Sequence, residues 1–247
     1  MGENKNPQKK TSTPGGRLEG RVALITGASR GIGAAVAVML AREGAHLILV
    51  SRTIGGLEET DDAIRAVGGT ATLTPMDLRD FGQIDQLGAA IAERFGHLDI
   101  LVGNAATLGV LSPVGHIQPK IWEEVIDVNV TANWRLIRSF DPLLRAAQAG
   151  RALFVTSGVT QGVFPYWGAY AMSKAALETL VRTYAGEISK TSVRANLIDP
   201  GVVRTLMRQK AFPGEDPLSL ATPEEIAPAF LPPLLPEFSE NGTIVRV

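Results

Sequence analysis

The chain of 247 residues contains no cysteine and only three histidines. It therefore forms no disulfide and has no thiolate nucleophile or cysteine-ligated zinc, which fits a reducing compartment such as the cytoplasm. The histidines, His46, His97 and His116, lie far apart and match no H-E-x-x-H spacing, so we expect no metal site. The formal net charge is -1, and no basic segment with interleaved aromatics occurs. We therefore expect no nucleic-acid partner.

Long apolar runs are also missing. The longest, AAVAVMLA at 34–41, is far shorter than the roughly 20 residues that a membrane-spanning helix needs. Residues 1–17 are polar and rich in Gly and Pro, without the apolar core of a signal peptide. We expect a disordered tail over 1–17, one dinucleotide-binding and catalytic domain over 18–247, no membrane partner and a cytoplasmic location.

Short apolar runs alternate with longer helical stretches from Arg21 onward. This pattern indicates repeated β-α-β units, and the nearly continuous apolar character of the runs is typical of strands covered on both faces. A Pro-rich excursion over 205–238 precedes the last run and is typical of a lid or binding loop. The fold class predicted is α/β, with a seven-stranded parallel sheet and helices on both faces. The expected strands are 21–26, 46–50, 70–75, 98–104, 151–157, 192–198 and 243–247.

The first predicted strand runs into TGASRGIG at 26–33, which opens a helix. Glycines permit a tight turn and a close approach of the backbone, and a helix N-terminus attracts a phosphate. The spacing G-x-x-x-G-x-G differs from G-x-G-x-x-G and lacks the Gly-Lys-[Ser/Thr] of a P-loop. The turn predicts a pyrophosphate cradle and disfavours a kinase or NTPase. The alternative is a plain strand-to-helix turn.

The second predicted strand ends at Ser51 and Arg52, where many dinucleotide-binding proteins have an acidic residue for the adenosine ribose. Arg52 and Arg30 in the turn offer two guanidinium groups, which suit a 2′-phosphate by charge and geometry. We therefore expect NADP(H) to be preferred, with NAD(H) possible. The alternative is that both arginines are merely solvated.

The stretch YAMSK places Tyr170 and Lys174 four positions apart. On a helix such residues lie on one face, about one turn from each other. A neighbouring ammonium favours the tyrosinate, so we expect Lys174 to lower the pKa of Tyr170 and make it an acid/base for neutral pH. The alternative is a chance pair in which the lysine stem covers the ring.

Taken together, the motifs resemble the common branch of the short-chain dehydrogenase/reductase family, and are similar to 3-oxoacyl-carrier-protein reductases. The resemblance spans nearly the whole chain from Gly20, and Ser157 precedes Tyr170 by thirteen residues. The motifs are TGASRGIG, MDL at 76–78, GNAA at 103–106, VNV at 128–130, FVTS at 154–157, YAMSK at 170–174 and DPGVVRT at 199–205.

The resemblance implies a single-domain, Rossmann-like, doubly wound sheet of order 3-2-1-4-5-6-7 and NAD(P)-dependent carbonyl/alcohol chemistry. It implies a catalytic group of Asn129, Ser157, Tyr170 and Lys174. Residues expected to bind the cofactor are Gly27, Ser29, Arg30, Gly31, Ile32, Gly33, Ser51, Arg52, Asp77, Leu78, Asn104, Ala105, Ala106, Tyr170, Lys174, Pro200, Gly201, Val203 and Thr205.

Two positions depart from the N-N-A-G pattern of the family. Gly103 replaces the first amide, which we expect to weaken a structural hydrogen bond near the fourth strand. Ala106 replaces the last glycine and is expected to add a methyl group beside the cofactor. Neither position supplies a reacting group.

The expected activity is hydride transfer between NADP(H) and a small carbonyl or alcohol. The segments 159–168 and 206–222 are expected to line the pocket; they carry aromatic and aliphatic residues, which favour an apolar substrate. One alternative is a reductase of 3-oxoacyl thioesters, with Arg135 and Arg138 near the docking site of an acidic carrier. Another is a non-catalytic dinucleotide-binding sensor or scaffold. The resemblance also implies a homodimer or homotetramer assembled through 117–147 and 168–190.

Overall fold

The computed structural model of the protein describes residues 16–247. The expected disordered tail therefore lies outside the described residues, except for its last two, Gly16 and Arg17. The Arg17 guanidinium pairs with the Glu43 carboxylate at 2.7 Å.

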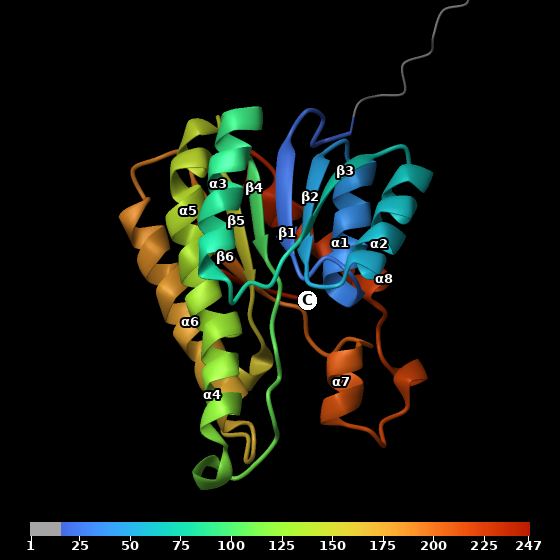
Figure 1. The fold of residues 1–247 in the computed structure, drawn as a ribbon, viewed down its shortest axis with the longest axis vertical. Helices are drawn as coiled ribbons and strands as arrows, with labels where there is room; N and C mark the ends of the chain where they lie inside the picture. Colours follow the sequence, from blue (N-terminus) through green and yellow to red (C-terminus); the bar gives the residue numbers. More distant parts are fainter. Residues whose placement is uncertain (1–15) are drawn as a thin grey trace, which may run out of the picture.

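All seven expected strands form, and they make one parallel sheet of order β3-β2-β1-β4-β5-β6-β7 (Figure 1). The predicted fold class and strand order are therefore confirmed. Because the strands are parallel, their carboxyl ends meet at one edge of the sheet, where a ligand site is expected. The strands are β1 Val22–Thr26, β2 His46–Ser51, β3 Thr70–Pro75, β4 Ile100–Gly103, β5 Arg151–Val155, β6 Arg194–Asp199 and β7 Ile244–Arg246.

Helices cover both faces of the sheet, and each face has its own apolar core (Figure 1). On one face α1 and α2 pack with the segment around Phe230, and on the other α3, α5 and α6 pack around Phe140 and Phe154. Each fully buried aliphatic or aromatic side chain of this kind stabilises the fold by roughly 1.5–3 kcal/mol. The long helices are α1 Gly31–Arg42, α2 Ile54–Ala66, α3 Phe81–Phe95, α5 Ala132–Ala146 and α6 Gly168–Glu187.

The long helix expected from Pro119 is interrupted. Helix α4, Pro119–Ile126, continues into a π-helical segment, η2 Asp127–Thr131, before α5 begins. Asn129 lies in η2, and its side chain bonds outside the helix, to the backbone of Thr107. Such π-helical turns occur frequently at functional sites. The interruption aims an amide from a helix interior at the neighbouring loop.

The excursion over 205–238 folds into short helices. Thr205, Asp216 and Thr222 each cap a helix N-terminus with a side-chain oxygen. The first helix lies at the carboxyl edge of the sheet, whereas the segments 223–226 and 227–230 pack against α1 (Figure 1). The helices are α7 Leu206–Ala211, η4 Pro217–Ser219, α8 Pro223–Ile226, η5 Ala227–Phe230 and η6 Pro232–Leu234; η1 Val114–His116 and η3 Gly158–Gln161 lie elsewhere.

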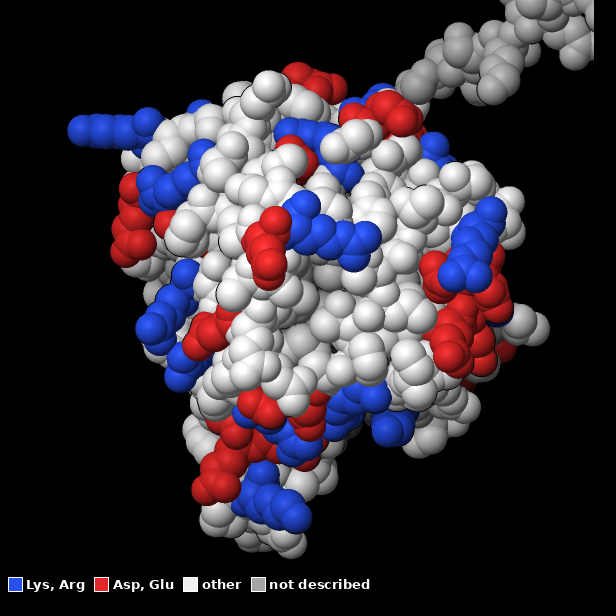
Figure 2. All heavy atoms as spheres, turned by 45° about the horizontal axis from the view of Figure 1, so that its top comes forward, with Lys and Arg blue, Asp and Glu red and all other residues white. Residues whose placement is uncertain are grey.

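Charged side chains of both signs are interspersed on the face shown in Figure 2, with no broad patch of one sign. Within 16–247, no helix is long and apolar enough to cross a membrane.

Candidate active site

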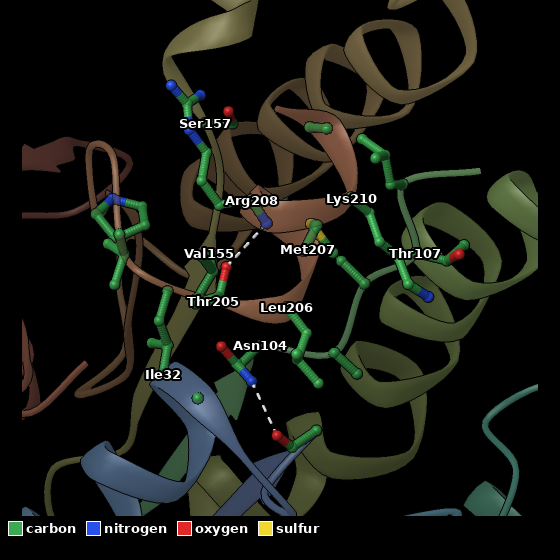
Figure 3. A pocket seen from close by; sticks show the side chains of 18 of the residues that line it. Ile32, Asn104, Thr107, Val155, Ser157, Thr205, Leu206, Met207, Arg208 and Lys210 are labelled. Carbon is green, nitrogen blue, oxygen red and sulfur yellow. Dashed lines mark hydrogen bonds between the residues drawn. The ribbon is translucent and has the colours of Figure 1, made fainter. Parts of the chain in front are cut away.

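A cleft of about 1070 Å³ opens at the carboxyl edge of the sheet. Loops after β1, β2, β3, β4, β5 and β6 form its walls, together with α6 and α7 (Figure 3). All but two of the predicted site residues line it; the exceptions are Gly33 and Asn129. The lining residues among those predicted are Gly27, Ser29, Arg30, Gly31, Ile32, Ser51, Arg52, Asp77, Leu78, Asn104, Ala105, Ala106, Ser157, Tyr170, Lys174, Pro200, Gly201, Val203 and Thr205.

The glycine turn after β1 depends on the absence of side chains. Gly27 and Gly31 have φ of 68° and 57°, a left-handed conformation that favours glycine. A Cβ on Gly33 would lie 2.3 Å from the carbonyl oxygen of Gly27 and 2.6 Å from Nδ2 of Asn104. Gly33 therefore permits close packing behind the turn and does not form part of the cleft wall.

The turn after β4 is held against the glycine turn by Thr26, which sequence reasoning missed. The backbone N–H groups of Asn104 and Ala105 both donate to Oγ1 of Thr26, at 3.1 Å. The Asn104 side chain donates to the Thr26 carbonyl at 2.9 Å. A threonine ending an otherwise apolar strand was the available signal, because a buried hydroxyl needs partners.

The predicted adenosine end of the cleft carries the expected hydroxyl and guanidinium groups. Ser51 donates to Oγ of Ser29 at 2.8 Å, and exposed Arg30 and Arg52 line the same end. Helix α1 begins without a side-chain cap, so its first N–H groups remain free for an anion. These features fit the diphosphate and ribose of an NAD(P) molecule.

Asp77 has a partner that the motif does not reveal. Arg79 pairs with its carboxylate at 2.6 Å. This hydrogen bond, assisted by the charge of Arg52, holds the pKa of Asp77 below its usual range despite partial burial. Asp77 is therefore an ionised acceptor at the edge of the cleft.

Tyr170, Lys174 and Ser157 come together where α6 passes the end of β5. Lys174 is fully buried, and its Nζ donates to the Val155 carbonyl at 2.8 Å. Burial lowers the pKa of Lys174 to about 8, although the carboxylate of Glu178 opposes this shift. Ser157 caps the N-terminus of η3, and its Oγ accepts a hydrogen bond from Val159 N at 3.4 Å. This bond does not use the hydroxyl hydrogen of Ser157, which can still be donated to the phenol oxygen of Tyr170 or to another acceptor.

The predicted direction of the Tyr170 pKa is wrong for this structure. Burial raises the pKa of Tyr170 to about 12, the Ser157 hydroxyl partly offsets the rise, and the carboxylate of Asp199 adds to it. The ammonium of Lys174 lies 5.7 Å from the ring centroid. Desolvation of the phenolate therefore outweighs any attraction to Lys174.

Asn129 is completely buried behind the cleft wall. Its Oδ1 accepts from Thr107 N at 2.8 Å, and its Nδ2 donates to Thr107 O and Ser173 Oγ, both at 2.9 Å. The amide thus links η2, the loop after β4 and α6. Its contacts tie together three elements that bear cleft residues.

Neighbouring side chains occupy the space beside Gly103. A Cβ at this position would lie 2.3 Å from the Phe154 ring and 2.7 Å from Oδ1 of Asn133. Buried Asn133, on α5, donates to the Asn129 carbonyl at 2.9 Å. Phe154 and Asn133 therefore fill the space that a larger side chain at position 103 would need. The expected weakening of a hydrogen bond near β4 stays a prediction. Ala106 lines the cleft as expected.

The far end of the cleft has an aromatic wall. Trp167 packs edge-on to Tyr170 at 6.0 Å between ring centroids, and against Phe212 at 5.8 Å. Arg208 lies 3.7 Å from the Phe212 ring centroid and pairs with Glu215 at 2.6 Å. Figure 3 shows Leu206, Met207 and Lys210 of α7 projecting into the same region as Thr107.

No group of three or more His, Asp or Glu side chains is placed to hold a metal ion within the described part of the chain.

Comparisons with known proteins identify the family. Residues 21–216 match the profile described as short chain dehydrogenase. An Escherichia coli K12 oxidoreductase, YciK, is 38% identical over 217 residues, 87% of this chain and 86% of the relative. A Mycobacterium tuberculosis protein named as an NAD-dependent oxidoreductase is 37% identical over 210 residues, which cover 79% of this chain and 76% of the relative. A solved Escherichia coli CFT073 short chain dehydrogenase complexed with NADPH has a TM-score of 0.90 and 35% identity, covering 95% of this chain and 99% of its own.

The chain belongs to the short-chain dehydrogenase family. Its predicted membership is confirmed, and it is an NAD(P)-dependent oxidoreductase, as expected. The sensor or scaffold alternative is set aside. The resemblance to 3-oxoacyl-carrier-protein reductases stays a prediction.

Proposed function

We propose that the protein interconverts a carbonyl and an alcohol with NADP(H), using Tyr170 as the general acid/base. The observation that carries the proposal is the convergence of the glycine turn, Ser157, Tyr170 and Lys174 on one cleft. The reaction needs a bound cofactor, a proton donor and a hydrogen-bond donor to the substrate oxygen within reach of one another.

The nicotinamide cofactor would supply or accept the hydride. The glycine turn and the free N-terminus of α1 would hold its diphosphate. Asp77 and Leu78 would meet the adenine, Asn104 to Ala106 the adenosine ribose, and the segment from Pro200 to Thr205 the nicotinamide carboxamide.

Tyr170 would give its proton to the substrate oxygen during reduction and take it back during oxidation. Its high pKa keeps the phenol protonated at neutral pH, which suits the reductive direction. Ser157 would donate its hydroxyl hydrogen to the same oxygen. Lys174 would bind the nicotinamide ribose, and Asn129 would help to hold water that resupplies the proton through Lys174.

The preference for NADP(H) rests on two cations at the adenosine end. Arg30 and Arg52 line the cleft, and the place of an acidic ribose acceptor is taken by Ser51. A carboxylate there would repel a 2′-phosphate, whereas a guanidinium pairs with it. The solved neighbour holds NADPH, but one relative is named NAD-dependent.

We test this preference with Arg52→Ala. We expect Kd for NADPH to rise about 10-fold or more, the effect of losing roughly 1.4 kcal/mol, while Kd for NADH changes little. Arg65→Ala is the control for the general loss of one positive charge, because Arg65 is exposed and does not line the cleft. Equal losses for both cofactors in Arg52→Ala would contradict the proposed role.

The substrate proposed is an apolar or aromatic carbonyl, because Trp167, Phe212, Leu206 and Met207 form the far wall. The thioester-reductase alternative would use a basic docking patch. Arg135 pairs with Asp85 at 3.4 Å and stacks over Trp134, so part of that charge is already neutralised. We therefore place simple ketones, aldehydes and quinones ahead of 3-oxoacyl thioesters.

The deciding experiment is NADPH and NADH oxidation against ketones, aldehydes, quinones and 3-oxoacyl thioesters. Turnover of apolar carbonyls with NADPH supports the proposal. Turnover confined to thioesters would favour the alternative, and cofactor binding without any turnover would contradict the carbonyl assignment.

We also propose a homodimer or homotetramer in the cytoplasm. Trp122 on α4 and Trp134 on α5 are 39% and 43% exposed, which suits helices that pack against another copy. Light scattering after gel filtration tests this, and a monomer at micromolar concentration would contradict it.

A further inference from the structure

Glu178 lies on α6, one helical turn beyond Lys174. The side chain of Glu178 is only 12% exposed. Its Oε1 accepts hydrogen bonds from the hydroxyls of Thr156 at 2.7 Å and Thr160 at 2.8 Å. Its other oxygen lies 4.0 Å from the largely exposed Arg182. The firm partners of Glu178 are therefore the two threonines.

The two threonines flank Ser157. Thr156 precedes it directly and is buried, with its N–H bonded to the Ile198 carbonyl at 2.8 Å. Thr160 closes the following turn, because its N–H donates to the Ser157 carbonyl at 3.2 Å. A hydroxyl has one hydrogen, so the shorter contact assigns that of Thr160 to Glu178 rather than to the Ser157 carbonyl at 3.1 Å. The Ser157 turn is thus fastened to α6 on both sides.

The Glu178 carboxylate also affects the pKa of Lys174. Burial lowers the pKa of Lys174 to about 8, and the charge of Glu178 raises it. On α6 the other nearby ionisable group is Tyr170, and from β5 the Val155 carbonyl accepts the bond from Lys174. The uncharged Asn129 of η2 bonds Ser173, the residue before Lys174. The carboxylate of Asp199, on β6, acts on Tyr170. Glu178 is the nearby group whose charge favours the ammonium form of Lys174.

We propose that Glu178 is a positioning residue that fastens the Ser157 turn to the helix bearing Tyr170 and keeps a compensating charge beside Lys174. The effect of Glu178 on catalysis rests on the proposed function. Glu178 does not line the cleft and therefore acts only through other residues.

Two substitutions separate the two effects. Glu178→Gln keeps an oxygen that accepts from both threonines but removes the charge, whereas Glu178→Ala removes both. Glu187→Gln is the matched control, since Glu187 is an exposed carboxylate on the same helix with no effect on the Lys174 pKa.

The first measurement is an NMR titration of the full-length protein carrying ¹³C at the lysine ε-carbons, with the Lys174 signal assigned from Lys174→Met. We expect Glu178→Gln to lower the midpoint for Lys174 by about half a pH unit or more and Glu187→Gln to leave it unchanged. An unchanged midpoint in Glu178→Gln overturns the electrostatic part of the proposal. This measurement needs neither substrate nor cofactor, so it stands even where the proposed function fails.

The second measurement is steady-state turnover with a carbonyl that the wild-type protein reduces. We expect Glu178→Ala to lower kcat about 10-fold or more, with KM and NADPH affinity within about threefold, and Glu178→Gln to recover part of the loss. The alkaline limb of the pH profile should move to lower pH in Glu178→Gln, because Lys174 loses its proton earlier. Parallel losses of kcat and cofactor affinity, or no loss in Glu178→Ala, overturn the positioning role. Absence of turnover in the wild-type protein contradicts the proposed function instead.

Discussion

The two ends of the cleft are built in different ways. At the glycine turn, backbone groups and small side chains determine the shape, as in the bonds of Asn104 and Ala105 to Thr26. At the α7 end, aromatic rings from distant parts of the chain determine it, chiefly Trp167 and Phe212. The glycine-turn end is suited to a ligand that does not vary, such as a cofactor. The shape of the α7 end can change through single side-chain substitutions.

Tyr170 lies where the two ends meet, so Tyr170→Phe should have the largest effect on turnover. We expect kcat to fall about 10²–10⁴-fold, the usual contribution of a general acid, with NADPH affinity retained. Tyr184→Phe is the control, because Tyr184 lies on the same helix but bonds Asp141 outside the cleft. Near-normal kcat in Tyr170→Phe would remove the proposed role.

Lys174 carries a cost in stability, because its ammonium group is buried in the cleft wall. Its pKa is about 8 in the folded protein against 10.5 in the unfolded chain, so below pH 8 folding carries the full cost of a buried charge. The difference between the two pKa values corresponds to a cost of about 3 kcal/mol, since one pKa unit is about 1.4 kcal/mol. The cost disappears as the pH rises towards 10.5.

Lys174→Met should therefore unfold at a higher temperature than wild type at pH 7, with a net gain of about 2 kcal/mol after loss of the bond to Val155. The gain should shrink at pH 10. Thermal unfolding at both pH values measures it, and an equal gain at both would contradict the buried-charge explanation.

Gly33→Ala should damage the glycine-turn end alone. The new Cβ has no space beside the Gly27 carbonyl, and relief of such overpacking costs about 1–3 kcal/mol. We expect Kd for NADPH to rise about 10-fold, measured by fluorescence titration. Gly55→Ala is the control, since no atom lies within 4 Å of the added Cβ. Similar effects of the two substitutions would show that space is not the cause.

Phe212→Ala should alter the α7 end with the smallest overall effect. We expect kcat/KM for aromatic carbonyls to fall severalfold relative to small aliphatic ones, the result of losing roughly 1 kcal/mol of aromatic contact. Cofactor affinity should not change. Leu218→Ala provides the control, because Leu218 is 81% exposed and outside the cleft wall. A changed NADPH affinity would show that the two ends are coupled.

The sheet was predictable because apolar runs and glycine turns are local signals. All seven strands lie within a few residues of their expected bounds, and Ser157, Tyr170 and Lys174 share the cleft that their motifs predicted. The interruption at η2 was not predictable, because it depends on an amide reaching the loop after β4. The direction of the Tyr170 pKa was also missed, because burial cannot be obtained from the spacing of two residues.

The sequence by itself determined where the strands lie along the chain, the glycines at the first turn and the spacing of Tyr170 from Lys174, since each follows from short-range sterics and helical or strand periodicity. The order of the strands in the sheet was implied by the family resemblance. Only the tertiary structure decided that Trp167 meets Phe212, that Asn133 lies beside Gly103, and that Glu178 bonds the threonines around Ser157. These contacts join residues far apart in the chain, and their formation depends on how α5, α6 and α7 pack upon the finished sheet.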